Sequence, residues 1–163
     1  MKSSFKYSLI AFAILSLFGC NVAKFAIDDK PQMNIDPALL GKWKVEKDGK
    51  KSDLYNITKQ DSAHYFITVK EYKNKKIDTA YAFLSDVRNS KFLNLYCKED
   101  TTWGYMFIRI IDINANHSKI TAACVSDTMF HSMVSAAQIR EHIYNNMTDP
   151  EFYSDTMHLV KVK

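Results

Sequence analysis

The sequence predicts a mainly β protein, an antiparallel up-and-down meander that closes into a barrel of about eight strands. Seven consecutive segments have strand patterns, and several of them alternate apolar and polar residues, as half-buried strands do. Short gaps that contain Asn, Asp or Ser separate them, which favours hairpins over crossover connections. The period becomes helical only near the C-terminus, and one further strand pattern follows. Strands in this order leave no exposed edge when they close into a barrel.

The first 19 residues have the order of a secretory signal, which is removed from the mature protein. Lys2 and Lys6 form a short basic region, and residues 7–18 are predominantly apolar. This run is shorter than the roughly 20 residues that a membrane-spanning helix needs. It ends in Leu17-Phe18-Gly19-Cys20, which resembles the lipobox of bacterial lipoproteins. The alternative is an ordinary secretory signal with cleavage after Ala23.

The lipobox resemblance implies cleavage before Cys20, diacylation of its thiol and acylation of its new amino group. Two or more acyl chains hold a protein stably on a bilayer. We therefore expect a lipoprotein of the bacterial cell envelope whose membrane partner is bound through Cys20. Asn21 occupies the position where, in that group, Asp retains lipoproteins in the inner membrane. The expected location is the outer membrane, facing the periplasm.

The mature chain is expected to begin with a tether, residues 20–35, followed by a single barrel domain, residues 36–163. Asp36 and Pro37 predict one capped helical turn. The predicted strands are 41–47, 54–59, 64–72, 76–84, 91–97, 103–112, 119–125 and 156–162. Asp48-Gly49 is typical of a two-residue hairpin turn. A capping box at Ser135 and apolar residues at every fourth position predict a helix over 135–147.

The chain at this point resembles the lipocalin-like, or calycin, group. Gly41-Lys42-Trp43 after the entry turn is similar to the Gly-X-Trp opening of that group, and a late helix before the last strand also fits. No Arg precedes the last strand to cover the tryptophan, as one does in that group. The predicted barrel-lining side chains are bulky aromatics on strands, and they either fill the interior or line a cavity. These are Trp43, Tyr65, Tyr81, Phe83 and Trp103.

Two cysteines remain if Cys20 carries lipid, namely Cys97 and Cys124. An oxidising envelope allows two thiols to pair. In a simple meander, however, the strand 103–112 separates them by about two strand spacings of 4.8 Å. A disulfide needs Cα atoms within about 7 Å. We expect no bridge, and a Cys97–Cys124 disulfide stays open as the alternative.

Several classes of function have no support in the sequence. Removal of the signal leaves 20 basic against 18 acidic residues, which gives no electrostatic footprint for nucleic acid. The five histidines have no metal-binding spacing, and glycine-rich phosphate loops and nucleophile elbows are missing, so no metal, cofactor or catalytic residue is predicted. We expect a non-catalytic module that contacts an envelope protein or polymer. A carrier of a small apolar ligand and an envelope enzyme are the alternatives.

Overall fold

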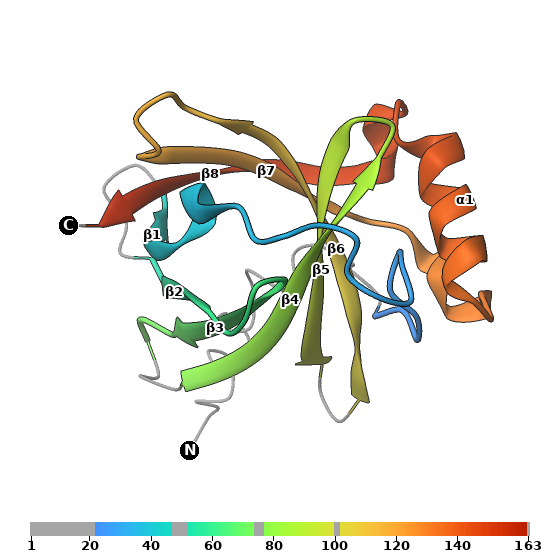
Figure 1. The fold of residues 1–163 in the computed structure, drawn as a ribbon, viewed down its shortest axis with the longest axis horizontal. Coiled ribbons are helices and arrows are strands. Elements are labelled where there is room, and N and C mark those ends of the chain that lie inside the picture. The colour runs from blue at the N-terminus through green and yellow to red at the C-terminus, as the bar shows by residue number, and fades with distance from the viewer. Residues whose placement is uncertain (1–21, 47–51, 74–76, 100–101, 163) are drawn as a thin grey trace, which may run out of the picture.

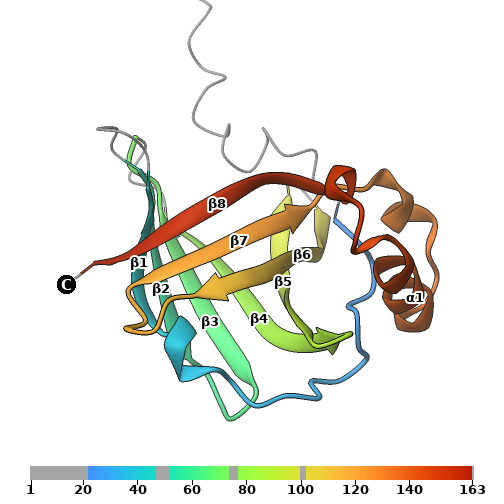
Figure 2. The ribbon, with the colours of Figure 1, turned by 90° about the horizontal axis from the view of Figure 1, so that it is seen from above.

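Eight antiparallel strands form a closed barrel in the computed structural model, which describes residues 22–46, 52–73, 77–99 and 102–162 (Figures 1 and 2). Each strand pairs with its neighbours in the chain, and β1 pairs with β8 to close the ring. The strands are β1 Gly41–Val45, β2 Leu54–Lys59, β3 His64–Lys70, β4 Ile77–Val87, β5 Ser90–Glu99, β6 Thr102–Ile113, β7 Lys119–Val125 and β8 Tyr153–Val162. The predicted fold class is therefore confirmed.

Short polar caps begin each helical element. The helical elements are the 3₁₀ turns η1 Pro37–Leu39, η2 Thr128–Ser132 and η3 Pro150–Phe152, and the α-helix α1 Ala136–Asn146. The Asp36 carboxylate accepts a hydrogen bond from the Ala38 amide, and Ser135 accepts one from Gln138, as predicted. η2, which Asp127 caps in the same way, was not predicted from the sequence.

The turn between β4 and β5 consists of Arg88 and Asn89, both at positive φ. This geometry matches the twist of two-residue hairpins. The predicted strands end at residue 84 and resume at residue 91, because Arg-Asn is a weak signal for such a turn. β4 consequently extends to Val87 and β5 begins at Ser90. The predicted Asp48-Gly49 turn lies outside the described residues.

The barrel interior is one apolar core. Trp43 and Tyr65 are fully buried there, and Leu39 of η1 packs against the same core. The inner wall of β4 carries the small side chains of Ala80 and Ala82. An eight-stranded barrel is only just wide enough for its own side chains, so small residues on one wall leave room for large ones on another.

A second apolar core lies outside the barrel wall, between the wall and α1 (Figure 1). Phe92 and Phe107 point outward from β5 and β6 into this core. Ile139 and Ile143 of α1 are fully buried against it. This contact explains the fourfold apolar repeat that predicted an amphipathic helix.

Residues 22–35 pack along the barrel, which differs from the tether that we expected. Figure 2 shows this segment running along the outside of the barrel, past α1, to η1. Ala23 exchanges two backbone hydrogen bonds with Tyr105 of β6, each 2.8 Å long. The Ile27 amide donates to Asn94 Oδ1 of β5 at 2.8 Å. Ala23 and Ile27 are each 1% exposed, so the segment is part of the folded domain.

Candidate functional site

Trp43 and Tyr65, two of the five predicted barrel-lining residues, lie in the interior core. Tyr81 and Phe83 point outward, because they alternate with the inward Ala82 along β4. Trp103 is 45% exposed, on the outer side of β6. The prediction is therefore wrong for Tyr81, Phe83 and Trp103. Both faces of β4 carry apolar side chains, so alternation alone did not identify the inner face.

Lys161 of the last strand covers Trp43. Its ammonium lies 4.9 Å from the centroid of the indole ring, a cation–π contact. The indole Nε1–H donates to the carbonyl of Leu39 at 2.9 Å, which fixes η1 over the ring. Gly41 has φ of 127°, and a Cβ at this position would lie 2.7 Å from Lys161 Cε. Residues 41–43 and the final strand thus form one packing unit, in which Lys161 covers the indole ring.

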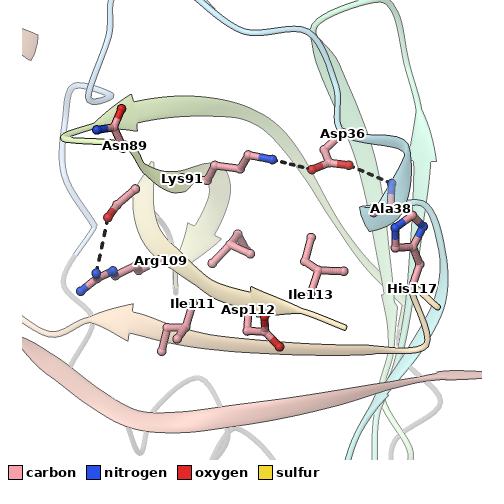
Figure 3. Close-up of a pocket in the computed structure, with 11 residues that line it drawn as sticks. Asp36, Ala38, Asn89, Lys91, Arg109, Ile111, Asp112, Ile113 and His117 are labelled. Carbon is pink, nitrogen blue, oxygen red and sulfur yellow. Dashed lines mark hydrogen bonds and ion pairs between the residues drawn. The ribbon is translucent and has the colours of Figure 1, made fainter. Parts of the chain in front are cut away.

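The candidate binding site is a pocket of about 390 Å³ at one end of the barrel (Figure 3). We call this end the mouth; the connections 60–63, 88–89 and 114–118 lie there, and the opposite end is the base. The pocket is lined by Asp36, Ala38, Asn89, Ser90, Lys91, Arg109, Ile110, Ile111, Asp112, Ile113 and His117. Its lining combines groups of both charges with isoleucines. A β-bulge between Ile110 and Asp112 bends β6 here.

An ion pair between Asp36 and Lys91 closes one side of the pocket, with 2.7 Å between the carboxylate and the ammonium (Figure 3). Burial raises the pKa of Asp36, but hydrogen bonds from Lys91 and from the Ala38 amide outweigh this effect. The pKa of Asp36 is therefore below its ordinary value. This pair connects η1 to β5, so it positions the entry turn at the mouth.

Arg109 contributes less to the pocket than its charge suggests. One guanidinium nitrogen donates to the Met147 carbonyl at 3.1 Å and to the Tyr153 hydroxyl at 3.3 Å. The other donates to Ser90 Oγ at 3.4 Å. These contacts hold Arg109 against the last turn of α1, where a cation is favourable. Asn89, Asp112 and His117 are exposed polar residues of the pocket lining (Figure 3).

Two histidines of the described part of the chain are engaged by carboxylates. His64 Nδ1 lies 2.9 Å from Asp61 at the mouth, and both side chains are partly exposed. His142 Nε2 lies 2.6 Å from Asp127, with its ring edge-on to Phe130. These contacts join η2 to α1 and close the β2–β3 turn. Within the described ranges, His, Cys, Asp and Glu form no group of three that could hold a metal ion.

Cys97 and Cys124 lie on β5 and β7, with β6 between them as expected. Both belong to a small cluster at the base, together with Val22 and Met106. The Cys97 thiol donates to Met106 Sδ at 3.3 Å. The Cys97–Cys124 disulfide that the sequence left open is not formed. Cys20 and the rest of the predicted signal lie outside the described residues.

Asn94 is a structural residue that sequence reasoning missed. It is fully buried on the outer side of β5, accepts from the Ile27 amide and donates to Ser85 Oγ at 2.8 Å. A polar residue between Leu93 and Leu95 looked like an ordinary solvent-facing position. Only the packing of residues 22–35 on the barrel, with the Ile27 amide donating to Asn94, shows why an amide is required at position 94.

Comparisons with known proteins give no family for this chain. No protein-family model, curated protein or solved structure matches it. The closed eight-stranded antiparallel barrel is consistent with a lipocalin-like fold. Among the described residues, no helix has the length and apolar character needed to cross a membrane.

Proposed function

We propose that this chain is a lipoprotein of the bacterial envelope, in which a non-catalytic, lipocalin-like barrel is anchored through acylated Cys20. The observation that carries the proposal is the continuity between anchor and domain. The lipobox-like motif ends at Cys20, and the chain is built into the barrel from Val22 onward. Cleavage after Ala23, the ordinary secretory alternative, would cut inside a buried β-bridge, so the mature domain would lose that contact.

Several ionisable side chains form ion pairs that hold elements of the fold together, which supports a non-catalytic role. Lys91 is paired with Asp36, His142 with Asp127, and Arg140 with Asp28 at 2.7 Å. Each pair connects two elements of the fold. A general acid or base must instead be within hydrogen-bond reach of a bound substrate.

The proposed partner is an envelope protein or polymer that binds the outer surface of the barrel domain. Met129 within η2 and Val134 just after it are 56% and 70% exposed, and they provide apolar contact area. A photo-crosslinking amino acid at Val134 should therefore capture the same envelope component reproducibly in cells. The same probe at Lys59, an exposed polar position of β2, is the control. Equal or no capture at both positions would contradict a partner on this surface.

Labelling with an alkyne fatty acid tests the anchor. The wild-type chain should incorporate the label, and Cys20→Ser should abolish both labelling and cleavage of the signal. Cys97→Ser is the matched control, because it removes a cysteine of the folded barrel and should leave labelling unchanged. A wild-type chain that matures without label would show that the lipoprotein proposal is wrong.

Cys124 provides a competing fate for Cys20. Val22 packs in the same cluster as Cys124, and Cys20 is only two residues away along the chain. Acylation consumes the Cys20 thiol in a thioether, so a lipidated Cys20 cannot also form a disulfide. Mass spectrometry of the unreduced mature protein separates the two outcomes. A Cys20–Cys124 disulfide would show that the Cys20 thiol carries no lipid and would refute the proposal.

The mouth pocket favours a second candidate function, the transient carriage of a small molecule. Its volume of about 390 Å³ lies within the range of ligand sites. Its lining carries groups of both charges, which fits a small zwitterion or carboxylate. An apolar ligand inside the barrel is disfavoured, because Trp43 and Tyr65 already occupy the interior. Thermal-shift measurements with a series of small carboxylates, amines and amino acids test this function. Stabilisation that Lys91→Met removes would support it.

A further inference from the structure

An aromatic ladder runs along the outer side of the β5–β6 pair at the base. We use this name for Tyr96, Trp103 and Tyr105. Tyr96 stacks on Trp103 with 5.3 Å between ring centroids and contacts Tyr105 at 4.9 Å. Trp103 is 45% exposed, whereas Trp43 is fully buried. An exposed tryptophan supported by two tyrosines is a costly arrangement for a surface that contacts only water.

Two residues of β6, Gly104 and Tyr105, hold Val22 and Ala23 against the barrel, and we call this contact the clamp. Tyr105 and Ala23 exchange their two backbone hydrogen bonds, so the chain pairs with β6 beside the ladder. Val22 is 8% exposed and packs over Gly104. A Cβ at position 104 would lie 2.7 Å from Val22 Cβ and 2.8 Å from the Ala23 carbonyl. Glycine is therefore required at this position for the close approach of the segment.

The clamp limits how far Cys20 can move away from the ladder. Two residues of fully extended chain span at most about 7 Å. An acylated Cys20, on which this inference rests as part of the proposed function, therefore brings the bilayer surface to the base. We propose that the barrel docks on the membrane in one orientation, with the aromatic ladder in the headgroup region and the mouth facing away.

The side chains at the base suit contact with a membrane surface. Tryptophan and tyrosine are enriched at membrane–water interfaces, where an apolar ring and a polar tip are both accommodated. Lys98 is exposed opposite Trp103 in the β5–β6 pair. At the same end of the barrel, where β3 ends and β4 begins, Tyr72 and Ile77 are 49% and 63% exposed, and Lys73 is exposed beside them. Lysines attract anionic headgroups while the aromatic and apolar side chains enter the interface.

Tryptophan quenching in vesicles tests the orientation. The full-length lipidated protein is reconstituted into phosphatidylethanolamine–phosphatidylglycerol vesicles, with and without brominated acyl chains. Brominated lipid should quench the emission of Trp103 and leave that of Trp43. Trp103→Phe should therefore remove the lipid-quenched component. In that background, Lys59→Trp places a reporter at the mouth end of β2, where aqueous acrylamide but not brominated lipid should quench it.

A linker variant isolates the clamp. Ten Gly and Ser residues inserted between Asn21 and Val22 leave both the lipid and the β-bridge in place but free the barrel from the bilayer. Quenching by brominated lipid should then fall about twofold or more, because flexible linkers of this composition impose no orientation. Retained acylation without quenching of Trp103 in the wild-type protein would overturn the docking proposal alone. Quenching that is equal with and without the linker would overturn the clamp as its cause. Absence of acylation would overturn the proposed function and, with it, this inference.

Discussion

Replacing Asn94 by Ala should destabilise the domain by releasing the N-terminal segment. Asn94 is 0% exposed and makes three hydrogen bonds, from the Ile27 amide and to Ser85 Oγ and the Phe83 carbonyl. Alanine leaves the Ile27 amide buried without its acceptor, at a cost of about 1–3 kcal/mol. The Ser85 hydroxyl can rotate and recover part of its loss. We therefore expect the free energy of unfolding to fall by about 2–4 kcal/mol in total.

Two assays separate global destabilisation from local release. Equilibrium unfolding in urea, followed by Trp43 fluorescence, measures the change in the free energy of unfolding. Limited trypsin digestion measures opening of the segment, because Lys24 is exposed between the buried Ala23 and Ala26. In Asn94→Ala, cleavage after Lys24 should accelerate in native buffer, before the barrel unfolds.

Asn145, an exposed residue of α1, provides a matched control for Asn94. Asn145→Ala removes an exposed amide from the surface of α1 and should change stability by no more than about 0.5 kcal/mol. The double variant Asn94→Ala with Ser85→Ala should cost less than the sum of the single changes, because the two side chains share one hydrogen bond. A loss below about 0.5 kcal/mol in Asn94→Ala, with unchanged cleavage after Lys24, would refute the role assigned to this amide.

Two further predictions concern the base and the mouth. Gly104→Ala should destabilise the domain by about 1–3 kcal/mol through overpacking against Val22 and should accelerate trypsin cleavage after Lys24; unaltered cleavage would contradict the clamp. The folded-state pKa of Asp36 is below its ordinary value of 3.8, so its contribution to stability is present above that value and is lost as the pH falls through the lower, folded-state pKa. Melting temperatures of Asp36→Asn should therefore be lower than wild type near neutral pH and converge with it in acid, whereas the exposed Asp29→Asn should follow wild type throughout.

Local sequence patterns determined the strands, the helix and the fold class of this protein. The bounds predicted for β2 and β7 match those in the structure. Asp36 and Ser135 marked the beginnings of η1 and α1, because capping depends only on groups within three residues. The closure of β1 on β8 followed from the strand count and the short connections.

Tertiary structure alone decided which side of each strand faces inward and what covers the outside. β4, β5 and β6 bury both walls, one in the barrel and one against α1 and residues 22–35, so alternation carried no information about inside and outside. Trp103 looked like a lining residue because its strand is the most apolar of the predicted set. The covering segment has no periodicity, because its burial depends on single contacts such as Ala23 with Tyr105 and Ile27 with Asn94. Contacts between residues 67 or more positions apart leave no trace in a local pattern, so only the folded chain shows that the expected tether is part of the domain.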